Sequence, residues 1–320
     1  MSTNKTSLGI AAGIIAGALW GLVFLAPELT PAFTPMQLAA GRYVAYGLVA
    51  VVLVSPLWRR LVKELSWKEW RGLLWISFTG NIVYYVFLAK AVQEGGVAMA
   101  SLVIGLLPVA VTLVGSRDRH AVPLRHLVPS IVLGLAGLGC ISWQTMTSAG
   151  TGSLIGLLCA IGALVSWTIY AVGNSRWLGR LTTVTPHEWN LLTGLVTGVE
   201  AVLLAVPAFV GATAAHDAPE WMHFIAVVTG VAIFCSIVGN AFWNYASRAL
   251  PLTMMGQMIV FETIFAALYG FLWEQRWPTV AELAAMVLLV AGVVSCAAVH
   301  RPHEDERRRN ESRAHTPSPT

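Results

Sequence analysis

The sequence predicts an all-α membrane protein with ten transmembrane helices in two inverted five-helix repeats. Its composition, the lengths of its apolar stretches and a weak internal similarity support this prediction. Of the 320 residues, 56% are hydrophobic and only 11% are charged, whereas about a quarter are charged in soluble domains. Such a chain cannot cover a large water-exposed surface, so we exclude a sizeable soluble domain.

The apolar stretches have the length of helical spans. A hydrocarbon core of roughly 30 Å takes about 20 residues of helix, and backbone groups in lipid must be paired within a helix or a closed barrel. The stretches lack the alternation that a β-barrel needs. We therefore expect helices at 8–27, 36–56, 72–91, 96–115, 127–146, 152–173, 188–211, 222–246, 252–272 and 280–299.

The first apolar stretch is expected to remain in the protein. It follows one basic residue, Lys5, and runs into Pro27 and Glu28 without a cleavage site of the small-x-small type. A secretory signal peptide carries such a site, so we interpret the stretch as a retained helix.

Lys and Arg residues are distributed unequally between the two sides of the predicted membrane. Seventeen of the 20 fall in the N-terminal segment, in the loops after every second span and in the C-terminal tail. Arg276 lies on the other side, and Arg42 and Lys90 fall within spans. Basic residues near span ends stay in the cytoplasm. We therefore expect both termini there, in a plasma membrane, which is the inner membrane in a bacterium.

A weak repeat divides the chain. A shift of 155 residues aligns Ala91 with Ala246, and Trp20 and Trp167 take the same place in the first and sixth spans. Because five is odd, five-helix repeats enter the membrane from opposite sides, and a pathway between them lies near the midplane. We expect repeats at 1–150 and 151–299, followed by a polar and disordered cytoplasmic tail at 300–320.

Five short motifs lie in or beside the predicted spans: Ala18-Leu19-Trp20-Gly21, Gly41-Arg42-Tyr43, Leu106-Leu107-Pro108-Val109, Phe261-Glu262-Thr263 and Trp273-Glu274-Gln275-Arg276. Together they resemble the drug/metabolite transporter superfamily, in particular its ten-helix EamA-type members. The sequence departs from the usual Glu-Pro of that family at Glu262-Thr263, and from its Gly-Glu at Trp273-Glu274. The resemblance implies a secondary transporter, commonly an exporter, with a central cavity between two inverted repeats.

Polar side chains follow one face of three predicted spans. The third span carries Asn81, Tyr84 and Tyr85, the seventh Asn190, Thr193, Thr197 and Glu200, and the eighth Ser236, Gly239, Asn240, Trp243 and Asn244. Amide and hydroxyl groups facing lipid would lack partners, so we expect the faces of the third and eighth spans to turn toward each other or toward a hydrated cavity. Hydrogen bonding between helices alone is the alternative.

Ionisable residues within the spans are few, and each costs at least ~2.5 kcal/mol at the bilayer centre unless it is paired or hydrated. Glu262 and Glu200 are the deepest, and Arg42 lies nearer the outer end of its span. We expect Glu262 to respond to protons, with Glu200 as its rival, and Arg42 to meet a solute carboxylate. A structural ion pair or hydrogen bond is the alternative for each. Lys90 and Glu94 are expected to reach water.

Aromatic side chains complete the expected solute pathway. The candidates for its walls are Trp20, Tyr43, Trp167, Tyr170 and Trp243. Large apolar surfaces bury most of a small organic ligand, and packing in the core is the alternative explanation.

Glu274 lies between the ninth and tenth spans. A carboxylate is favoured at a helix N-terminus, so we expect Glu274 to cap the tenth span near Thr279. A role in gating is the alternative.

The sequence lacks the motifs of common enzyme classes. It has no Walker glycine loop, no HExxH pair, no GxSxG elbow and no GxGxxG helix start. Its four cysteines lie in apolar runs without zinc or redox spacing. We expect no cofactor, no metal and no nucleic-acid partner.

These features favour a transporter, not an enzyme. We expect export of a small solute, such as an amino acid, a related metabolite or a cationic drug, coupled to protons or exchange. A membrane scaffold or lipid-handling protein without transport is the alternative, and a membrane-embedded enzyme is more distant.

Overall fold

The computed structural model describes residues 3–115, 124–147, 152–181, 183–210, 216–249, 252–295 and 298. Within these ranges the chain forms helices joined by short turns, and no strand occurs there. The tail expected at 300–320 lies outside the described residues.

The elements of the two halves follow one another in a similar order. The first half holds α1 (Thr3–Gly21), η1 (Leu22–Leu25), α2 (Ala26–Leu29), α3 (Pro35–Val54), η2 (Ser55–Leu57), α4 (Trp58–Glu64), α5 (Trp67–Ser77), the π-helical turn η3 (Phe78–Val83), α6 (Tyr84–Gly95), α7 (Val97–Ile104), α8 (Leu107–Gly115) and α9 (Leu124–Thr147). The second half holds α10 (Gly152–Leu178), α11 (Pro186–Phe209), α12 (Ala218–Val231), the π-helical turn η4 (Ala232–Gly239), α13 (Asn240–Ala249) and α14 (Leu252–Trp273), and a last apolar helix, Val280–Ser295.

Ten apolar helical segments confirm the predicted all-α membrane fold. Six of them have 23 to 30 residues, and 23 residues at 1.5 Å per residue extend about 35 Å, which is enough to cross a hydrocarbon core. Four further segments in the described part of the chain are shorter: Val97–Val111, Arg125–Cys140, Val260–Trp273 and Val280–Ser295.

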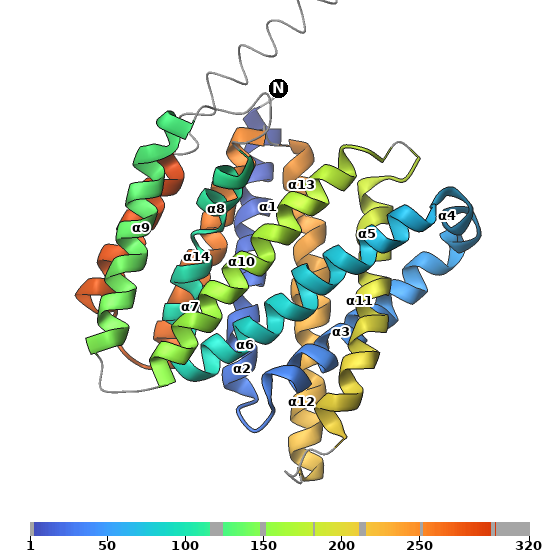
Figure 1. Cartoon of the computed structure of the whole chain (residues 1–320), viewed down its shortest axis with the longest axis horizontal. Coiled ribbons are helices and arrows are strands. Elements are labelled where there is room, and N and C mark those ends of the chain that lie inside the picture. The colour runs from blue at the N-terminus through green and yellow to red at the C-terminus, as the bar shows by residue number, and fades with distance from the viewer. Residues whose placement is uncertain are drawn as a thin grey trace, which may run out of the picture.

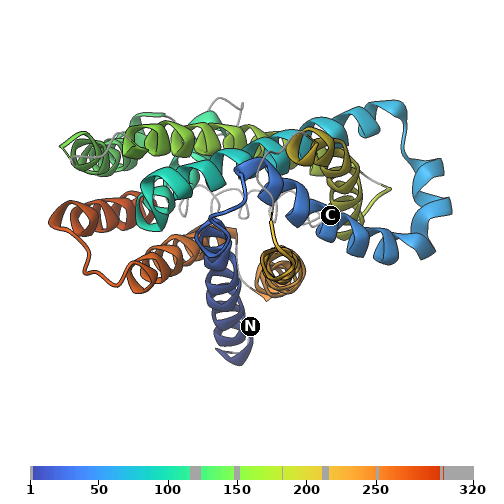
Figure 2. The same cartoon turned by 90° about the horizontal axis from the view of Figure 1, so that it is seen from below.

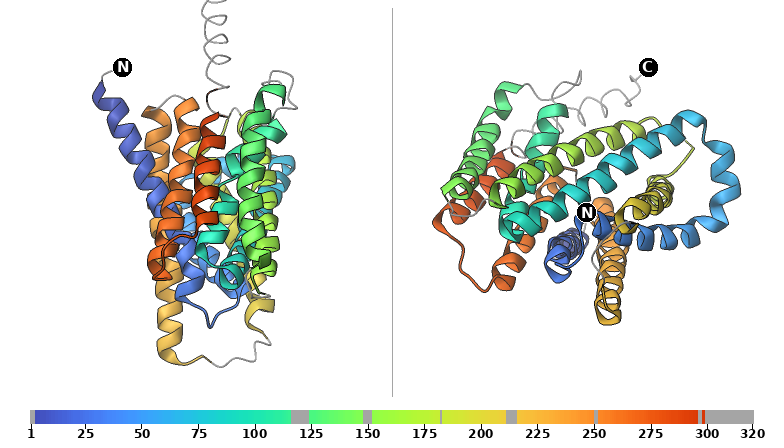
Figure 3. Two further views of the ribbon diagram at one scale, coloured as in Figure 1. Left: turned by 90° about the vertical axis from the view of Figure 1, so that its left-hand side faces the viewer. Right: turned by 60° about the horizontal axis from the view of Figure 1, so that its bottom comes forward.

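The two ends of the helical bundle differ in charge. Figure 1 shows that α1 starts at the same end as α4 and α5, and this end carries Arg59, Arg60, Lys63, Lys68 and Arg71. We call it the basic end. The start of α12 lies at the opposite end (Figures 1 and 3). Figure 2 shows α9 at one side of the bundle and the turn from α3 through α4 to α5 at the other.

The starts of α3, α5, α11 and α12 share one capping device. In each, a Thr, Ser or Asp accepts a backbone N–H of the first helical turn, and the third residue after it returns a side-chain oxygen to the cap N–H. The pairs are Thr34 with Gln37, Ser66 with Glu69, Thr185 with Glu188 and Asp217 with Glu220. Thr185 follows Thr34 by 151 residues and Asp217 follows Ser66 by 151, so corresponding helices of the two halves start alike.

Glycines bring helices from the two halves into backbone contact. A Cβ atom added to Gly47 of α3 would lie 2.5 Å from Cα of Gly198 of α11. In the same way, a Cβ atom on Gly21 of α1 would lie 2.9 Å from the backbone nitrogen of Ala266 of α14. Small residues allow such close approach in membrane bundles, so these contacts fix α3 against α11 and α1 against α14.

The fourth predicted span is discontinuous. α7 ends at Ile104, a turn follows at Gly105 and Leu106, and α8 starts at Leu107. Pro108 has no N–H to donate to the Ile104 carbonyl, and its ring collides with that carbonyl in a regular helix. The sequence analysis treated 96–115 as one helix, and Pro108 accounts for the break.

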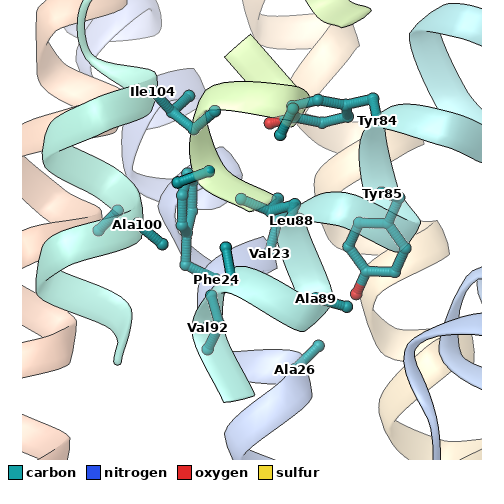
Figure 4. Packing of buried hydrophobic residues seen from close by; sticks show 14 of the residues in the cluster. Val23, Phe24, Ala26, Tyr84, Tyr85, Leu88, Ala89, Val92, Ala100 and Ile104 are labelled. Carbon is teal, nitrogen blue, oxygen red and sulfur yellow. The ribbon is translucent and has the colours of Figure 1, made fainter. Parts of the chain in front are cut away.

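Apolar side chains of the first half form much of the core. Figure 4 shows Phe24 of η1 beside Leu88 and Val92 of α6 and Ala100 and Ile104 of α7, and all five are buried. Tyr84 and Tyr85 continue this cluster along α6. The core therefore holds the helix that carries both tyrosines in place.

Candidate functional site

Arg42 is a buried cation between aromatic rings. It lies on α3, two turns after the capping box at Thr34, and is 8% exposed. Its Cζ atom is 4.4 Å from the ring centre of Tyr85 on α6 and 5.0 Å from that of Tyr43. The two rings meet edge to face with centres 5.8 Å apart. Cation–π attraction therefore holds the guanidinium in the core.

The guanidinium of Arg42 lacks a full set of hydrogen-bond partners. Its Nε and Nη1 atoms are buried and donate no hydrogen bond. Glu262 on α14 is close enough to interact with Arg42 electrostatically, but among the ion pairs of the described residues none joins the two. A buried charge without a hydrogen-bonded partner is costly. Two donors of the cluster are therefore available to bind an anion.

Glu262 lies where α14 crosses α1. A Cβ atom on Gly17 of α1 would be 2.9 Å from the Glu262 backbone nitrogen, so the two helices touch at this residue. The following residue, Thr263, is buried and packs against Gly105, with its Cγ2 atom 2.7 Å from an added Cβ. Thr263 therefore faces the break between α7 and α8.

Trp20 connects α1 to the π-helical turn η4. Its Nε1 donates to the Cys235 carbonyl at 3.0 Å, and its ring centre is 5.0 Å from that of Trp243. A Cβ atom on Gly239 would be 2.8 Å from Trp20 Nε1. A π-helical turn changes the hydrogen-bonding register of the backbone and is frequent at functional sites.

The first half contains a corresponding arrangement at η3. Ser166 Oγ of α10 donates to the Thr79 carbonyl at 2.7 Å. The ring of Tyr170 covers Gly80, where an added Cβ would be 2.2 Å from its Cδ2 atom. Trp167 lies beside Tyr170 with ring centres 5.6 Å apart. Thus α1 supports η4, and α10 supports η3.

The expected amide groups make hydrogen bonds within the helices and between neighbours. Asn81 Nδ2 donates to Thr197 Oγ1 of α11 at 2.8 Å, and Asn240 Nδ2 donates to the Ser236 carbonyl of its own helix at 2.7 Å. The Asn81 amide therefore contacts the seventh span, as the alternative of hydrogen bonding between helices allows. The side chain of Asn244 lies outside the described part of the structure, and cavity lining by the three residues stays a prediction.

Glu200 is a second carboxylate with an unpaired atom. Its Oε2 is buried and accepts no hydrogen bond, and no ion pair of the described residues includes it. Seven residues later on the same helix, Pro207 lines a groove of about 460 Å³. The groove is also lined by Phe87, Lys90 and Cys159. Its lining includes neither Arg42 nor Glu262 nor Glu200, so the groove is separate from the Arg42 cluster.

An ion pair lies near the opposite end. Lys90 pairs with Glu94 one turn further along α6, and both side chains are partly exposed. The expectation that they reach water stays a prediction.

The cap before the tenth span is formed by Glu282. Its Oε2 accepts the Thr279 backbone N–H at 2.7 Å, and Thr279 Oγ1 accepts the Glu282 N–H at 3.2 Å. Glu274 instead binds Arg276, with Oε2 at 2.6 Å from Nε. The expected Glu274 cap is therefore wrong, because the reciprocal spacing of Thr279 and Glu282 satisfies the same N–H groups.

An aromatic cluster at the opposite end was missed by the sequence analysis. Phe33 stacks on His216 and Phe224 with ring centres 4.1 and 4.2 Å away, and Trp221 meets it edge to face at 5.2 Å. It joins the loop before α3 to α12. Trp70, 151 residues before Trp221, packs on an apolar cluster at the basic end. The two tryptophans therefore take corresponding positions in the two halves, and this correspondence is the sequence signal that could have predicted the aromatic cluster.

The apolar cluster at the basic end also joins the two halves. It contains Leu61 and Leu73 of the first half and Val184 and Trp189 of the second. Arg60 and Glu188 form an ion pair beside it. Contacts between the halves are therefore present at both ends of the bundle in this conformation.

Comparisons with known proteins agree with this architecture. The profile of the EamA-like transporter family matches residues 7–143 and again residues 154–297. The chain is 32% identical over 308 residues to inner membrane protein YtfF of Escherichia coli, covering 89% of this chain and 94% of that protein. It is 20% identical to the uncharacterized transporter YoaV of Bacillus subtilis, covering 90% and 95%.

A solved crystal structure has the same fold. It covers 92% of this chain and 98% of its own, with a TM-score of 0.59 and 21% sequence identity. The two family matches, each of which covers one half, identify the group to which the protein belongs. The chain is a member of the EamA-like transporter family, a family of multi-pass membrane proteins.

Proposed function

We propose that this protein is a secondary active transporter that exports small organic solutes by alternating access between its two halves. One observation carries the proposal. Arg42 is buried with free hydrogen-bond donors and is surrounded by elements of both halves, α3 and α6 from the first and η4 and α14 from the second. A solute site at the interface of inverted repeats can be exposed to either side when the halves rock.

The contacts at the two ends support such a movement. The cluster around Phe33 closes the opposite end and the cluster around Leu61 closes the basic end, and each joins the two halves. Opening one cluster while the other stays packed exposes the Arg42 region to one side. In the proposed orientation the basic end is cytoplasmic, because it carries the positive residues. The proposed repeats at 1–150 and 151–299 meet between the two segments that match the family.

Solute flux in protein-only liposomes tests the proposal. A growth-toxicity screen of amino acids, metabolites and drugs, in cells lacking and overproducing the chain, first selects the solutes. We expect the purified protein to carry at least one of them across the membrane faster than protein-free liposomes do. Normal incorporation without flux of any selected solute would favour the scaffold function, in which polar contacts such as Asn81–Thr197 serve only to pack the helices.

Glu262 is the proposed proton-responsive group. It lies near the middle of the ninth span beside the Arg42 cluster, whereas Glu200 lies on α11 apart from it. A carboxyl group that binds and releases a proton couples flux to a pH gradient, and Gln cannot do so. We expect Glu262→Gln to fold and bind solute, as shown by a solute-induced thermal shift, but to lose the response of flux to the gradient.

Glu200→Gln is the matched control and should keep that response. If flux in Glu262→Gln still responds fully to the pH gradient, Glu262 has a structural role and not a coupling role. Loss of the dependence in Glu200→Gln alone would move proton coupling to the seventh span.

A further inference from the structure

Resting on the proposed transport function, we propose that Arg42 is the subsite that binds the carboxylate of the transported solute. The rings beside it would hold the apolar body of the same solute. The proposal therefore narrows the solute class to small organic acids or zwitterions with one carboxylate next to an apolar group.

The structure leaves two donors of the guanidinium for such a ligand. The ring centres of Tyr85 and Tyr43 lie 4.4 and 5.0 Å from Cζ and attract its positive charge. Cation–π attraction supplies no oxygen acceptor for an N–H donor. Nε and Nη1 have no partner and are closed to water in this conformation. The carboxylate of a bound solute would supply the acceptor that these two donors lack.

Arg276 has the carboxylate partners that Arg42 lacks. Its Nη1 and Nη2 donate to the two carboxylate oxygens of Glu282 at 2.7 and 2.6 Å, and its Nε donates to Glu274 at 2.6 Å. Arg42 has no such carboxylate, although it is far more deeply buried. The contrast points to a binding function for Arg42, because a purely structural arginine at this depth would be paired.

The surroundings favour a monoanion. Arg42 supplies one positive charge, and Glu262 is a nearby carboxylate that can supply a negative one. A dianion such as phosphate would leave at least one negative charge uncompensated among the rings of Tyr43 and Tyr85. A single carboxylate balances the guanidinium when Glu262 carries a proton, and it matches the planar donors of Arg42.

Matched ligand sets test this inference on the purified full-length protein in detergent. One set is phenylalanine, phenylalaninamide and 3-phenylpropionate, and another is leucine, leucinamide and 4-methylpentanoate. The members of a set share one apolar body and carry both charges, only the ammonium, or only the carboxylate. We expect at least one set in which the amino acid or the acid raises the unfolding temperature and the amide does not.

Variants connect this preference to Arg42. Arg42→Gln should weaken binding of the preferred carboxylate at least 30-fold while leaving the solute-free unfolding temperature unchanged or higher, because the variant removes an unpaired charge. Arg42→Lys should retain part of the binding. Arg276→Gln is the matched control, and it should lower the unfolding temperature without changing carboxylate binding.

Four results would overturn the inference: an equal response to the amide, no response to any carboxylate in either set, unchanged binding in Arg42→Gln, or a loss of solute-free stability in that variant as large as in Arg276→Gln. Flux in liposomes separates the two proposals. A carboxylate-specific thermal shift without flux would retain the subsite and reject transport, whereas flux without carboxylate preference would retain transport and reject the subsite.

Discussion

The two halves of the chain share their helix starts and π-helical turns but differ in their charges. Thr34 and Thr185 cap corresponding helices, and η3 and η4 interrupt corresponding spans. Arg42, by contrast, corresponds to Thr193 at the same spacing of 151 residues. Thr193 Oγ1 donates to the Trp189 carbonyl of its own helix at 2.9 Å and carries no charge.

This difference distinguishes the helical framework, which is repeated in both halves, from the proposed solute site, which is not. The repeated features set where helices start, bend and cross, and these properties are needed equally in both halves. A solute has only one orientation in its site at a time, so its binding groups need not be repeated. We therefore expect mutations of repeated features to affect stability in both halves alike, and mutations of unrepeated charges to affect transport.

The largest expected effect comes from Arg42 and its counterpart. Arg42→Gln should lower flux of a carboxylate solute about 100-fold at solute concentrations below saturation, because removal of one partner from a buried charge pair costs about 2–5 kcal/mol. Thr193→Val should change flux less than about two-fold, since it removes one hydrogen bond within a helix. Initial rates in liposomes with equal amounts of protein measure both. Similar losses of flux in the two variants would contradict the proposal that only the first half supplies the charge for solute binding.

An intermediate effect is expected for the glycines under the aromatic rings. An added Cβ would lie 2.2 Å from Tyr170 in Gly80→Ala and 2.8 Å from Trp20 in Gly239→Ala. Overpacking of this kind costs about 1–3 kcal/mol, so both variants should unfold at lower temperature. Gly230→Ala is the control, because an added Cβ there has no neighbour within 4 Å. A lower unfolding temperature in only one of the two variants would show that η3 and η4 are not equivalent.

A smaller effect is expected for the side chains that donate to the π-helical turns. Ser166→Ala removes the donor to Thr79, and Trp20→Phe removes the donor to Cys235. Each loss should cost about 0.5–1.5 kcal/mol, measured as a lower midpoint of unfolding in denaturant. Unchanged midpoints in both variants would mean that water or another side chain replaces the donor.

The fold was largely predictable because its main signals are local. Apolar stretches of sufficient length specify helices in lipid whatever their neighbours are. The signals for helix starts are also local. Thr279 and Glu282 have the spacing of a capping box, and the prediction that Glu274 caps this helix overlooked that spacing. Pro108 likewise indicated the break after Ile104.

The site was less predictable because its contacts join distant segments. Arg42, Glu262 and Trp20 were selected from their residue types, but the rings that flank Arg42 depend on how α3 packs on α6. For Asn81 the sequence left open the eighth span, a hydrated cavity and a hydrogen bond to another helix. Its partner is Thr197 of α11, because the rotation of a helix about its axis is set by tertiary packing. The π-helical turns have no sequence signature of their own, and so the Cys235 carbonyl was not foreseen.

The central claim is that the solute binds between the halves at the unrepeated charges. A structure of the protein with a solute identified by the flux screen tests this most directly. The account predicts density for the solute among α3, α6, η4 and α14, with its carboxylate on Arg42. A solute bound instead in the groove lined by Phe87 and Lys90, with Arg42 still unpaired, would contradict it.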